Sequence, residues 1–270
     1  MTNITWAGTA TATSSISHGS DTRGLVTMLR RETIISDGHL TPIPLISGNS
    51  LRGRLRRIAE DLLRDTLRYD GQLTIAAAAA LRSGGALAKT SNEPISGAKL
   101  AQLRHLVPLI GVFGTAGAGR IIDGCLQVGK LLPHAQETAA LLDLPTQTLL
   151  PIADLTQIET YSRVDDNHRH AAATITDQPG SQLQYRIETF RAGTTFDIWL
   201  NLTNPTPLEA SFFTDVIDTF TQHPTIAGRT AIGHGNLRLN LHRTGTTAPA
   251  DWRTHITANT TEVIDALNQL

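Results

Sequence analysis

The chain has 270 residues, a formal net charge of −1 at pH 7 and 40% hydrophobic residues, which is enough to form a core and excludes a wholly disordered protein. No apolar run approaches the roughly 20 residues of a membrane helix, and the N-terminal sequence lacks the basic and apolar regions of a secretory signal. The single cysteine, Cys125, excludes an internal disulfide, so we expect a cytoplasmic protein.

The charge is distributed unevenly along the chain. Residues 1–136 contain 15 Lys and Arg against 9 Asp and Glu, whereas residues 137–270 contain 8 against 15. Twenty of the 23 basic residues are arginine, whose planar guanidinium is suited to phosphate contacts. The nearly neutral average therefore does not exclude a nucleic-acid partner.

The first half of the chain begins with strand signals and continues into a helix. Residues 4–16 are rich in Thr, Ser and Ala and are interpreted as a strand, and an apolar run follows at 25–29. A helix capped by Asn49 or Ser50 and ending near Leu67 is predicted next. It is indicated by apolar residues at helical spacing, which are Leu51, Leu55, Ile58 and Leu62.

The middle of the chain is less regular. Two short helices, at residues 76–81 and 97–106, show no wide apolar face and are interpreted as insertions. Residues 111–119 are rich in glycine, and residues 121–132 read as a strand.

The second half contains a long polar segment, residues 156–184, with almost no aliphatic residues. A segment of about 30 residues without a core pattern is usually functional or disordered. The regular elements expected after it are a strand at 196–202, a helix at 208–222, a strand at 237–241 and a helix at 260–270. Without the insertions the order is β-α-β-β-α-β, which predicts an α+β protein of ferredoxin-like arrangement, a fold with many functions, RNA binding among them.

The strongest local signal is an arginine cluster at the start of the predicted helix. Arg52, Arg54, Arg56 and Arg57 lie there, and no acid occurs in the helix before Glu60. The N-terminal turn of a helix favours negative charge, so this cluster favours a bound anion such as a phosphate backbone. The alternative is a solvated face with Arg56–Glu60 and Arg57–Asp61 ion pairs, which leaves Arg52 and Arg54 without local partners.

Other segments give weaker signals. The glycine-rich loop at 114–120 lacks the ending of a nucleotide-binding loop, and we interpret it as presenting Arg120 to a partner. Residues 233–236 either let the backbone approach a ligand or a neighbouring strand closely, or form a tight turn before the last strand. Residues 165–170 contain two acids and two histidines, but a polar loop tip is favoured over a metal site. Cys125 is interpreted as a core residue, and no catalytic residue, metal or cofactor is predicted.

Five short motifs follow one another along the chain. They are IPLISGNSLRG at 43–53, LRSGG at 81–85, VFG at 112–114, ETFRAGTTF at 188–196 and GHG at 233–235. Taken in this order, they resemble the RAMP superfamily, the backbone subunits of class-one CRISPR ribonucleoproteins, whose "IPGSSLKG" signature is similar to the first motif. The resemblance spans about residues 4–242. The inserted helix with its Ser-Gly-Gly is most similar to the type IV group.

The resemblance implies a single domain over residues 1–270, with a modified ferredoxin-like (RRM-like) palm, a helical finger at about 69–107 and a β-hairpin thumb at about 154–185. It implies an oligomer stacked head to tail on a guide (CRISPR) RNA, with other CRISPR effector subunits and a target nucleic acid as partners. The residues expected to contact RNA are Arg30, Arg31, Ser47, Asn49, Ser50, Arg52, Arg54, Arg56, Arg57, Arg120, Arg163, His168, Arg169, Gly233, His234, Gly235 and Asn236.

One departure from the family concerns cleavage. Type III backbone subunits cut target RNA with an aspartate in a pattern like Gly-Ile-Asp-Asn-Pro-Val, whereas residues 24–28 here, GLVTM, contain no acid. We therefore expect a non-catalytic subunit. The alternatives are a type III-like RNA endonuclease that uses Asp21 or Asp37, and a small-molecule enzyme with His168 or His234 as its base.

Overall fold

The computed structural model describes residues 2–85, 95–117, 120–163 and 183–270. Its centre is a four-stranded sheet in the order β12 (Leu237–Thr244), β1 (Asn3–Ala12), β11 (Thr195–Thr203) and β8 (Leu126–Val128). All neighbouring strands in this sheet are antiparallel. Because the chain also contains many helices, the predicted α+β class is confirmed.

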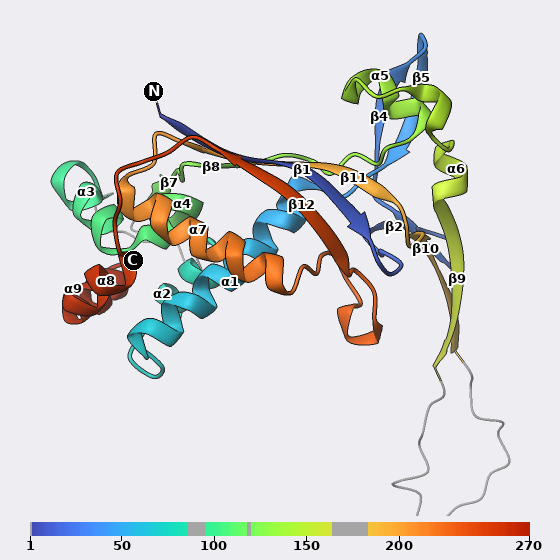
Figure 1. Cartoon of the computed structure of the whole chain (residues 1–270). Coiled ribbons are helices and arrows are strands. Elements are labelled where there is room, and N and C mark those ends of the chain that lie inside the picture. The colour runs from blue at the N-terminus through green and yellow to red at the C-terminus, as the bar shows by residue number, and fades with distance from the viewer. Residues whose placement is uncertain (1, 86–94, 118–119, 164–182) are drawn as a thin grey trace, which may run out of the picture.

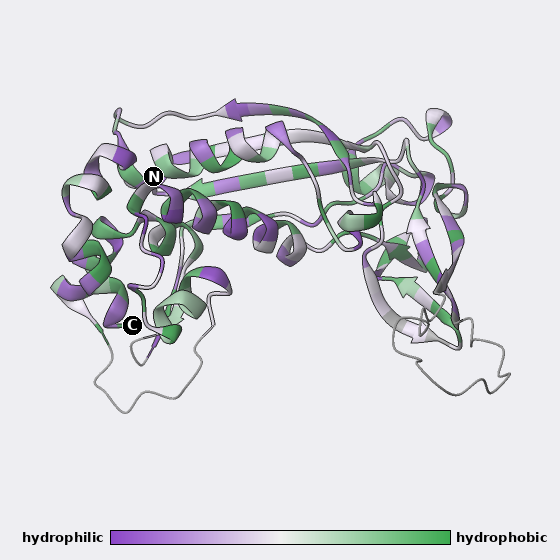
Figure 2. Ribbon diagram, turned by 90° about the horizontal axis from the view of Figure 1, so that it is seen from below, coloured by the Kyte–Doolittle hydropathy of each residue, from purple (hydrophilic) through white to green (hydrophobic). Residues whose placement is uncertain are grey.

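Two long helices, α1 (Gly48–Leu67) and α7 (Pro207–Gln222), lie side by side under one face of this sheet (Figure 1). The chain order through sheet and helices is β1-α1-β8-β11-α7-β12, as the sequence predicts. Apolar residues on the inner face of each helix pack into the core, and Phe212, Phe213 and Phe220 are fully buried or nearly so. The helices carry both hydrophobic and hydrophilic residues (Figure 2), as expected of helices with one buried face.

Shorter elements cover one end of the two helices (Figure 1). They are α2 (Ile75–Arg82), α3 (Gly97–Leu106), α4 (Pro108–Phe113), β6 (Thr115–Gly117), β7 (Arg120–Ile122), α8 (Trp252–Ala258) and α9 (Thr260–Asn268). The first two of these helices each contribute a buried leucine, Leu81 and Leu103, to the main core, although neither was predicted to show a wide apolar face.

A second sheet forms the opposite end of the molecule (Figure 1). Its strand order is β2 (Gly19–Arg23), β3 (Val26–Leu29), β10 (Leu183–Phe190) and β9 (Thr156–Arg163). The remaining elements at this end are the hairpin β4 (Arg31–Ser36) and β5 (His39–Pro44), the short helices α5 (Ala139–Leu142) and α6 (Ile152–Leu155), and 3-10 turns at Gln136–Thr138 and Thr146–Thr148. A further 3-10 turn lies at Thr230–Ile232.

Two sequence expectations, both on the bounds of strands, are corrected by these elements. The strand predicted at 4–16 ends at Ala12, and the strand predicted at 121–132 is divided into β7 and β8. The polar segment 156–184 is strand at both of its ends, because β9 and β10 pair with each other along their length. No helix of the described residues is long and apolar enough to cross a lipid bilayer.

Candidate nucleic-acid interface

The start of α1 is fixed by three neighbouring contacts. Ser47 caps the helix by accepting the Ser50 backbone N–H at 3.3 Å, and its own N–H donates to Nε2 of His18 at 3.2 Å. A Cβ on Gly48 would lie 2.7 Å from the Val128 carbonyl oxygen, so only glycine allows this close approach to β8. Ser47 and Gly48 therefore fix the start of α1 close to the sheet. The first turn of α1 contains no acid.

A pocket of about 380 Å³ opens beside this helix start. It brings together four of the predicted site residues, Arg30, Ser47, Asn49 and Arg52. The other lining residues are Glu32, Gly48, Val128 and Lys130. Sequence reasoning missed Lys130, which lies just after β8 and belongs to no motif; its Nζ donates to Glu32 at 2.5 Å.

Two arginines of the cluster, Arg52 and Arg56, are directed into the protein. Arg52 donates to the carbonyl oxygens of Leu126 at 2.6 Å and Phe113 at 2.8 Å. The Arg56 side chain, in a residue only 6% exposed, makes a larger set of hydrogen bonds. Its acceptors are the carbonyl oxygens of Leu81 at 2.6 Å, Ala80 at 2.5 Å, Gly114 at 2.9 Å and Phe113 at 3.3 Å.

These carbonyl groups explain how the cations are tolerated. Those bound by Arg56 lie at the C-terminal ends of α2 and α4, where unpaired carbonyls and the helix dipole favour positive charge. Burial, with a smaller contribution from Arg52, lowers the pKa of Arg56 to about 10, so it stays charged at neutral pH. We call Arg52 and Arg56 the inward arginines.

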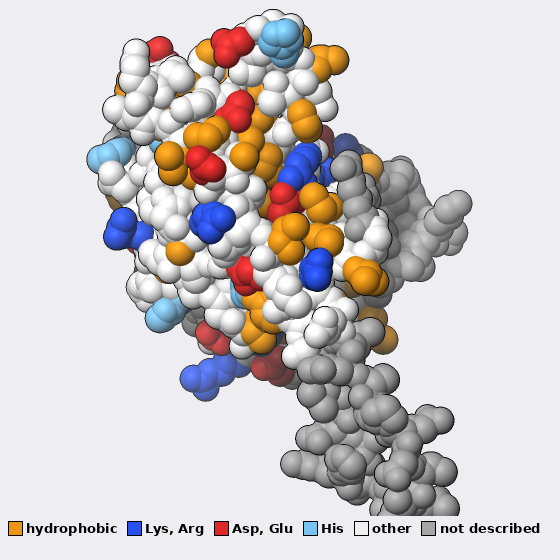
Figure 3. All heavy atoms as spheres, turned by 90° about the vertical axis from the view of Figure 1, so that its right-hand side faces the viewer, with side chains coloured by type: hydrophobic (Ala, Val, Ile, Leu, Met, Phe, Trp, Pro, Cys, Tyr) orange, Lys and Arg blue, Asp and Glu red, His pale blue; other side chains and the backbone are white. Residues whose placement is uncertain are grey.

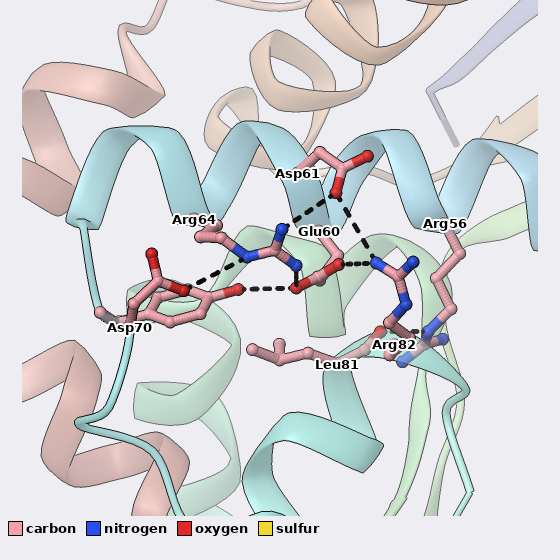
Figure 4. Close-up of polar contacts among 8 residues, drawn as sticks. Arg56, Glu60, Asp61, Arg64, Asp70, Leu81 and Arg82 are labelled. Carbon is pink, nitrogen blue, oxygen red and sulfur yellow. Dashed lines mark hydrogen bonds and ion pairs between the residues drawn. The ribbon is translucent and has the colours of Figure 1, made fainter.

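The ion pairs of the solvated-face alternative do not form as predicted. Glu60 is bound instead by Arg64 and by Arg82 at 2.5 Å, and the Tyr69 hydroxyl donates to it at 3.2 Å (Figure 4). Asp61 lies 3.4 Å from Arg64 and 3.6 Å from Arg82. Both acids therefore pair with arginines further along the chain, although the charge of Asp61 also attracts Arg54.

Three further cations, Arg30, Arg54 and Arg57, make no ion pair within the described part of the chain. The pKa of Arg54 is lowered, first by burial and then by repulsion from Arg57, and its Nε is buried without a hydrogen-bond partner among the described residues. Arg30 and Arg57 are exposed. We call these three the outward arginines. Arg31, in contrast, is held by Glu188.

A second group of predicted residues, 233–236, lies against the base of the β9–β10 hairpin. His234 is 4% exposed, and its Nε2 is 2.6 Å from the Tyr161 hydroxyl. The Gly235 N–H donates to the Ser15 carbonyl, and a Cβ there would overlap the Ile226 carbonyl oxygen. Gly233 and Asn236 are exposed. The segment is therefore a tight turn in close contact with neighbouring backbone, and its approach to a ligand stays a prediction.

The remaining predicted residues are dispersed. Arg120 starts β7, where its Nη1 donates to the Ile95 carbonyl at 2.9 Å, and β7 lies at the opposite end from the hairpin (Figure 1). Ser50 follows Asn49 on α1 and is partly exposed. Arg163 is the last residue of β9, whereas His168 and Arg169 lie outside the described residues.

The residues considered for catalysis or metal binding are not gathered into one site among the described residues. Asp37 lies in the exposed turn between β4 and β5. Burial, followed by the nearby Glu209 charge, raises the pKa of Cys125 to about 12, which keeps the thiol protonated. Within the described ranges no three His, Cys, Asp or Glu side chains gather as metal ligands. The weighed metal segment, 165–170, lies outside those ranges.

Comparisons with known proteins find similarity among solved structures. No protein-family model matches the sequence, and the curated proteins contain no match. Among solved structures, a chain described as "Type IV-B CRISPR Complex" is 31% identical in sequence, with a TM-score of 0.64. The match covers 93% of this chain and 96% of that chain, so it extends over nearly the whole fold.

Proposed function

Because this chain belongs to the family of type IV CRISPR complex subunits, we propose that it is a non-catalytic backbone subunit that binds guide RNA. Copies of the chain oligomerise head to tail along the CRISPR RNA and form a helical ribonucleoprotein. The guide's own bases then pair with the target, while the protein reads the backbone and shape of the guide.

The observation that carries this proposal is the cationic pocket at the start of α1. The pocket combines a helix N-terminus without acids, Arg30, and the Lys130–Glu32 pair. Such a helix end attracts phosphate through its unpaired N–H groups and its dipole. Arg54 and Arg57 lie one to two turns further along the same helix, and they supply further charge for the RNA backbone.

The proposed palm, finger and thumb correspond to particular elements. The sheet order β12-β1-β11-β8 with α1 and α7 on one face supports a ferredoxin-like palm, because strands one and three of that arrangement are central. Residues 69–107, which include α2 and α3, are the proposed finger. Residues 154–185 are the proposed thumb; they include β9 and the first residues of β10, which pair with each other.

Exposed apolar side chains support contact with neighbouring subunits. Figure 3 shows hydrophobic side chains in several clusters over the end of the molecule that carries β4, β5, α5 and β9. The large hydrophobic residues exposed on these elements and adjoining loops are Leu25, Ile35, Leu40, Leu141, Leu150 and Ile158. Apolar surface of this kind is typical of interaction sites. The opposite charge of the two halves of the chain favours head-to-tail association.

The non-catalytic part of the proposal has its own test. It rests on the absence of an acid from residues 24–28, and Asp37 lies in an exposed turn. We expect the purified complex to leave a guide-matched RNA intact. Cleavage that is abolished by Asp21→Ala or Asp37→Ala would instead establish the type III-like endonuclease.

The backbone role is tested by what co-purifies with the full chain. We expect a high ratio of absorbance at 260 nm to that at 280 nm, and nuclease digestion should leave protected RNA in a ladder of regular steps. Each step would be the length covered by one subunit. A protein-like ratio, monomeric elution and no binding to added single-stranded RNA at low salt would contradict the proposal.

A further inference from the structure

Two tyrosines at the base of the β9–β10 hairpin form a stacked pair. Tyr161 and Tyr185 are cross-strand partners, with ring centroids 5.6 Å apart and an angle of 17° between the ring planes. The guanidinium carbon of Arg229 lies 5.0 Å from the Tyr185 ring centroid, and its Nη1 donates to the Tyr185 hydroxyl at 3.3 Å. Three planar groups from separate segments therefore form one cluster.

Hydrogen bonds of the Tyr161 hydroxyl hold the cluster in place. The Tyr161 hydroxyl donates to Glu159 at 2.5 Å and lies 2.6 Å from Nε2 of His234. Glu159 is itself fixed, because it accepts from the Thr189 hydroxyl at 2.8 Å and the Gln157 amide at 2.9 Å. Burial and the contact with Glu159 raise the pKa of Tyr161 to about 12, which keeps the phenol a donor at neutral pH.

The position of the cluster indicates a role beyond packing. Tyr161, Tyr185 and Arg229 are each partly exposed, and none belongs to the main hydrophobic core. Ile232 and Gly233, which follow Arg229 closely in the sequence, are also exposed. Beneath the cluster, the buried His234 has an Nδ1 atom with no hydrogen-bond partner among the described residues. A rigid, accessible set of aromatic rings and a guanidinium is the arrangement on which unpaired bases stack.

We infer that Tyr161, Tyr185 and Arg229 form a stacking site for one nucleobase of single-stranded RNA. This inference rests on the proposed function, and it adds a base contact to the phosphate contacts proposed for α1. Arg229 supplies a planar surface for the base and a positive charge for the adjoining phosphate. Stacking tolerates every base, so the site holds one nucleotide of the guide without reading its sequence.

The test uses the full chain and single-stranded RNA oligonucleotides that carry 2-aminopurine at one position at a time. Tyr185→Leu removes the ring, whereas Tyr185→Phe keeps it. Arg229→Lys keeps the charge but removes the planar group. Arg243→Lys is the matched control, because Arg243 also lies over an aromatic ring, 5.4 Å from that of Trp6, but on the edge strand β12.

We expect one or a few positions of the oligonucleotide to show quenched 2-aminopurine fluorescence with wild type and with Tyr185→Phe. Tyr185→Leu should abolish the quenching and lower the affinity about 5- to 150-fold, as expected for the loss of one stacked base. The slope of log K against log salt should stay unchanged, because every phosphate contact is kept. Arg229→Lys should lose quenching in the same way, and Arg243→Lys should behave as wild type.

Two negative results have different meanings. In the first, wild type binds RNA, and Tyr185→Leu and Arg229→Lys bind it equally well with the quenching retained. The inference of a stacking site is then wrong, and the proposed function stands. If wild type binds no RNA even at low salt, both fail. The ring-preserving Tyr185→Phe separates loss of stacking from loss of fold, which circular dichroism checks for every variant.

Discussion

The helices α1 and α7 lie side by side under the same sheet, yet they begin in opposite ways. Helix α7 starts with Thr206, Pro207 and Glu209, whose capping box satisfies backbone N–H groups and places an acid at the positive end of the dipole. Helix α1 has a serine cap, no acid and four arginines in its first three turns.

The comparison shows that a helix start can accept cations when other backbone groups supply the missing negative charge. Arg52 and Arg56 reach the carbonyl groups of α2, α4 and β8. Arg54 and Arg57 make no such contact within the described residues. One cluster therefore divides into inward arginines, which bind backbone carbonyl groups of the protein, and outward arginines, which we propose bind an external anion.

The largest effect on stability is expected from Arg56→Leu. This substitution leaves the buried carbonyl groups of Leu81 and Gly114 without a donor among the described residues. It also removes a donor from the Ala80 carbonyl, which keeps the Gly84 N–H and the Thr115 hydroxyl. Losing hydrogen bonds to a buried charged group should lower the free energy of unfolding by about 3 kcal/mol or more. Urea denaturation measures this loss. The exposed neighbour gives the control, since Arg57→Leu should change the value by no more than about 0.5 kcal/mol. Equal stability of the two variants would remove the distinction between inward and outward arginines.

A smaller loss is expected at the start of α7. Glu209→Ala removes the acceptor for the Thr206 N–H and the partner of Arg104, which lies 2.9 Å away. We expect a loss of about 2 kcal/mol, made up of the cap and a partly exposed ion pair. Thr206→Ala removes one half of the capping box and should cost about 1 kcal/mol. This prediction is contradicted if Glu209→Ala lowers the free energy of unfolding by less than Thr206→Ala does, in thermal or urea unfolding.

The smallest expected effect is a pH dependence at the start of α1. Burial and the charge of Arg30 lower the pKa of His18 in the folded protein, whereas the unfolded value is about 6.5. The unfolded chain therefore binds the proton more readily, so this contribution to stability is complete above pH 6.5 and decreases as the pH falls below it. Protonation also removes the acceptor for the Ser47 N–H.

The free energy of unfolding at pH 7.5 and at pH 5.5 checks this prediction. The loss between the two values should be smaller in His18→Gln than in wild type, since glutamine does not titrate. Glu159 does not interfere, because its pKa is lowered to about 2 and its contribution is lost only in stronger acid. An identical loss in both proteins would show that His18 is not the titrating group.

The sequence predicts the regular elements well where burial repeats with a clear period. The apolar residues of α1 and α7 recur at helical spacing, and β11 alternates buried and exposed residues along its length. Elements are not predicted from the sequence where their packing depends on partners that are distant in the chain. Strands β9 and β10 are polar and form by pairing with each other, and α8 carries only Trp252 and Ile256 as buried residues.

The candidate site was predicted to a similar extent. The motif at 47–50 located the helix start, because capping is local, but the predicted cap was wrong: the cap is Ser47, and Asn49 and Ser50 lie inside the first turn of α1. The direction of Arg52 and Arg56 was not predictable, since their acceptors lie 24 to 74 residues away in sequence. Tyr161 and Tyr185 were missed as well. Of only three tyrosines in the chain, one lies near the start of the polar segment and one directly after its end, and aromatic pairing across a hairpin could have been expected from this spacing.

The central claim is that the outward arginines grip RNA phosphates, and the salt dependence of RNA affinity tests it most directly. The dissociation constant of a single-stranded RNA is measured from low to moderate salt for wild type, for Arg54→Gln with Arg57→Gln, and for the control Arg68→Gln at the other end of α1. We predict that the double variant binds more weakly and that its log–log slope is shallower by about 1.4, or about 0.7 for each phosphate that is no longer neutralised. A double variant with the affinity and slope of wild type would contradict the account.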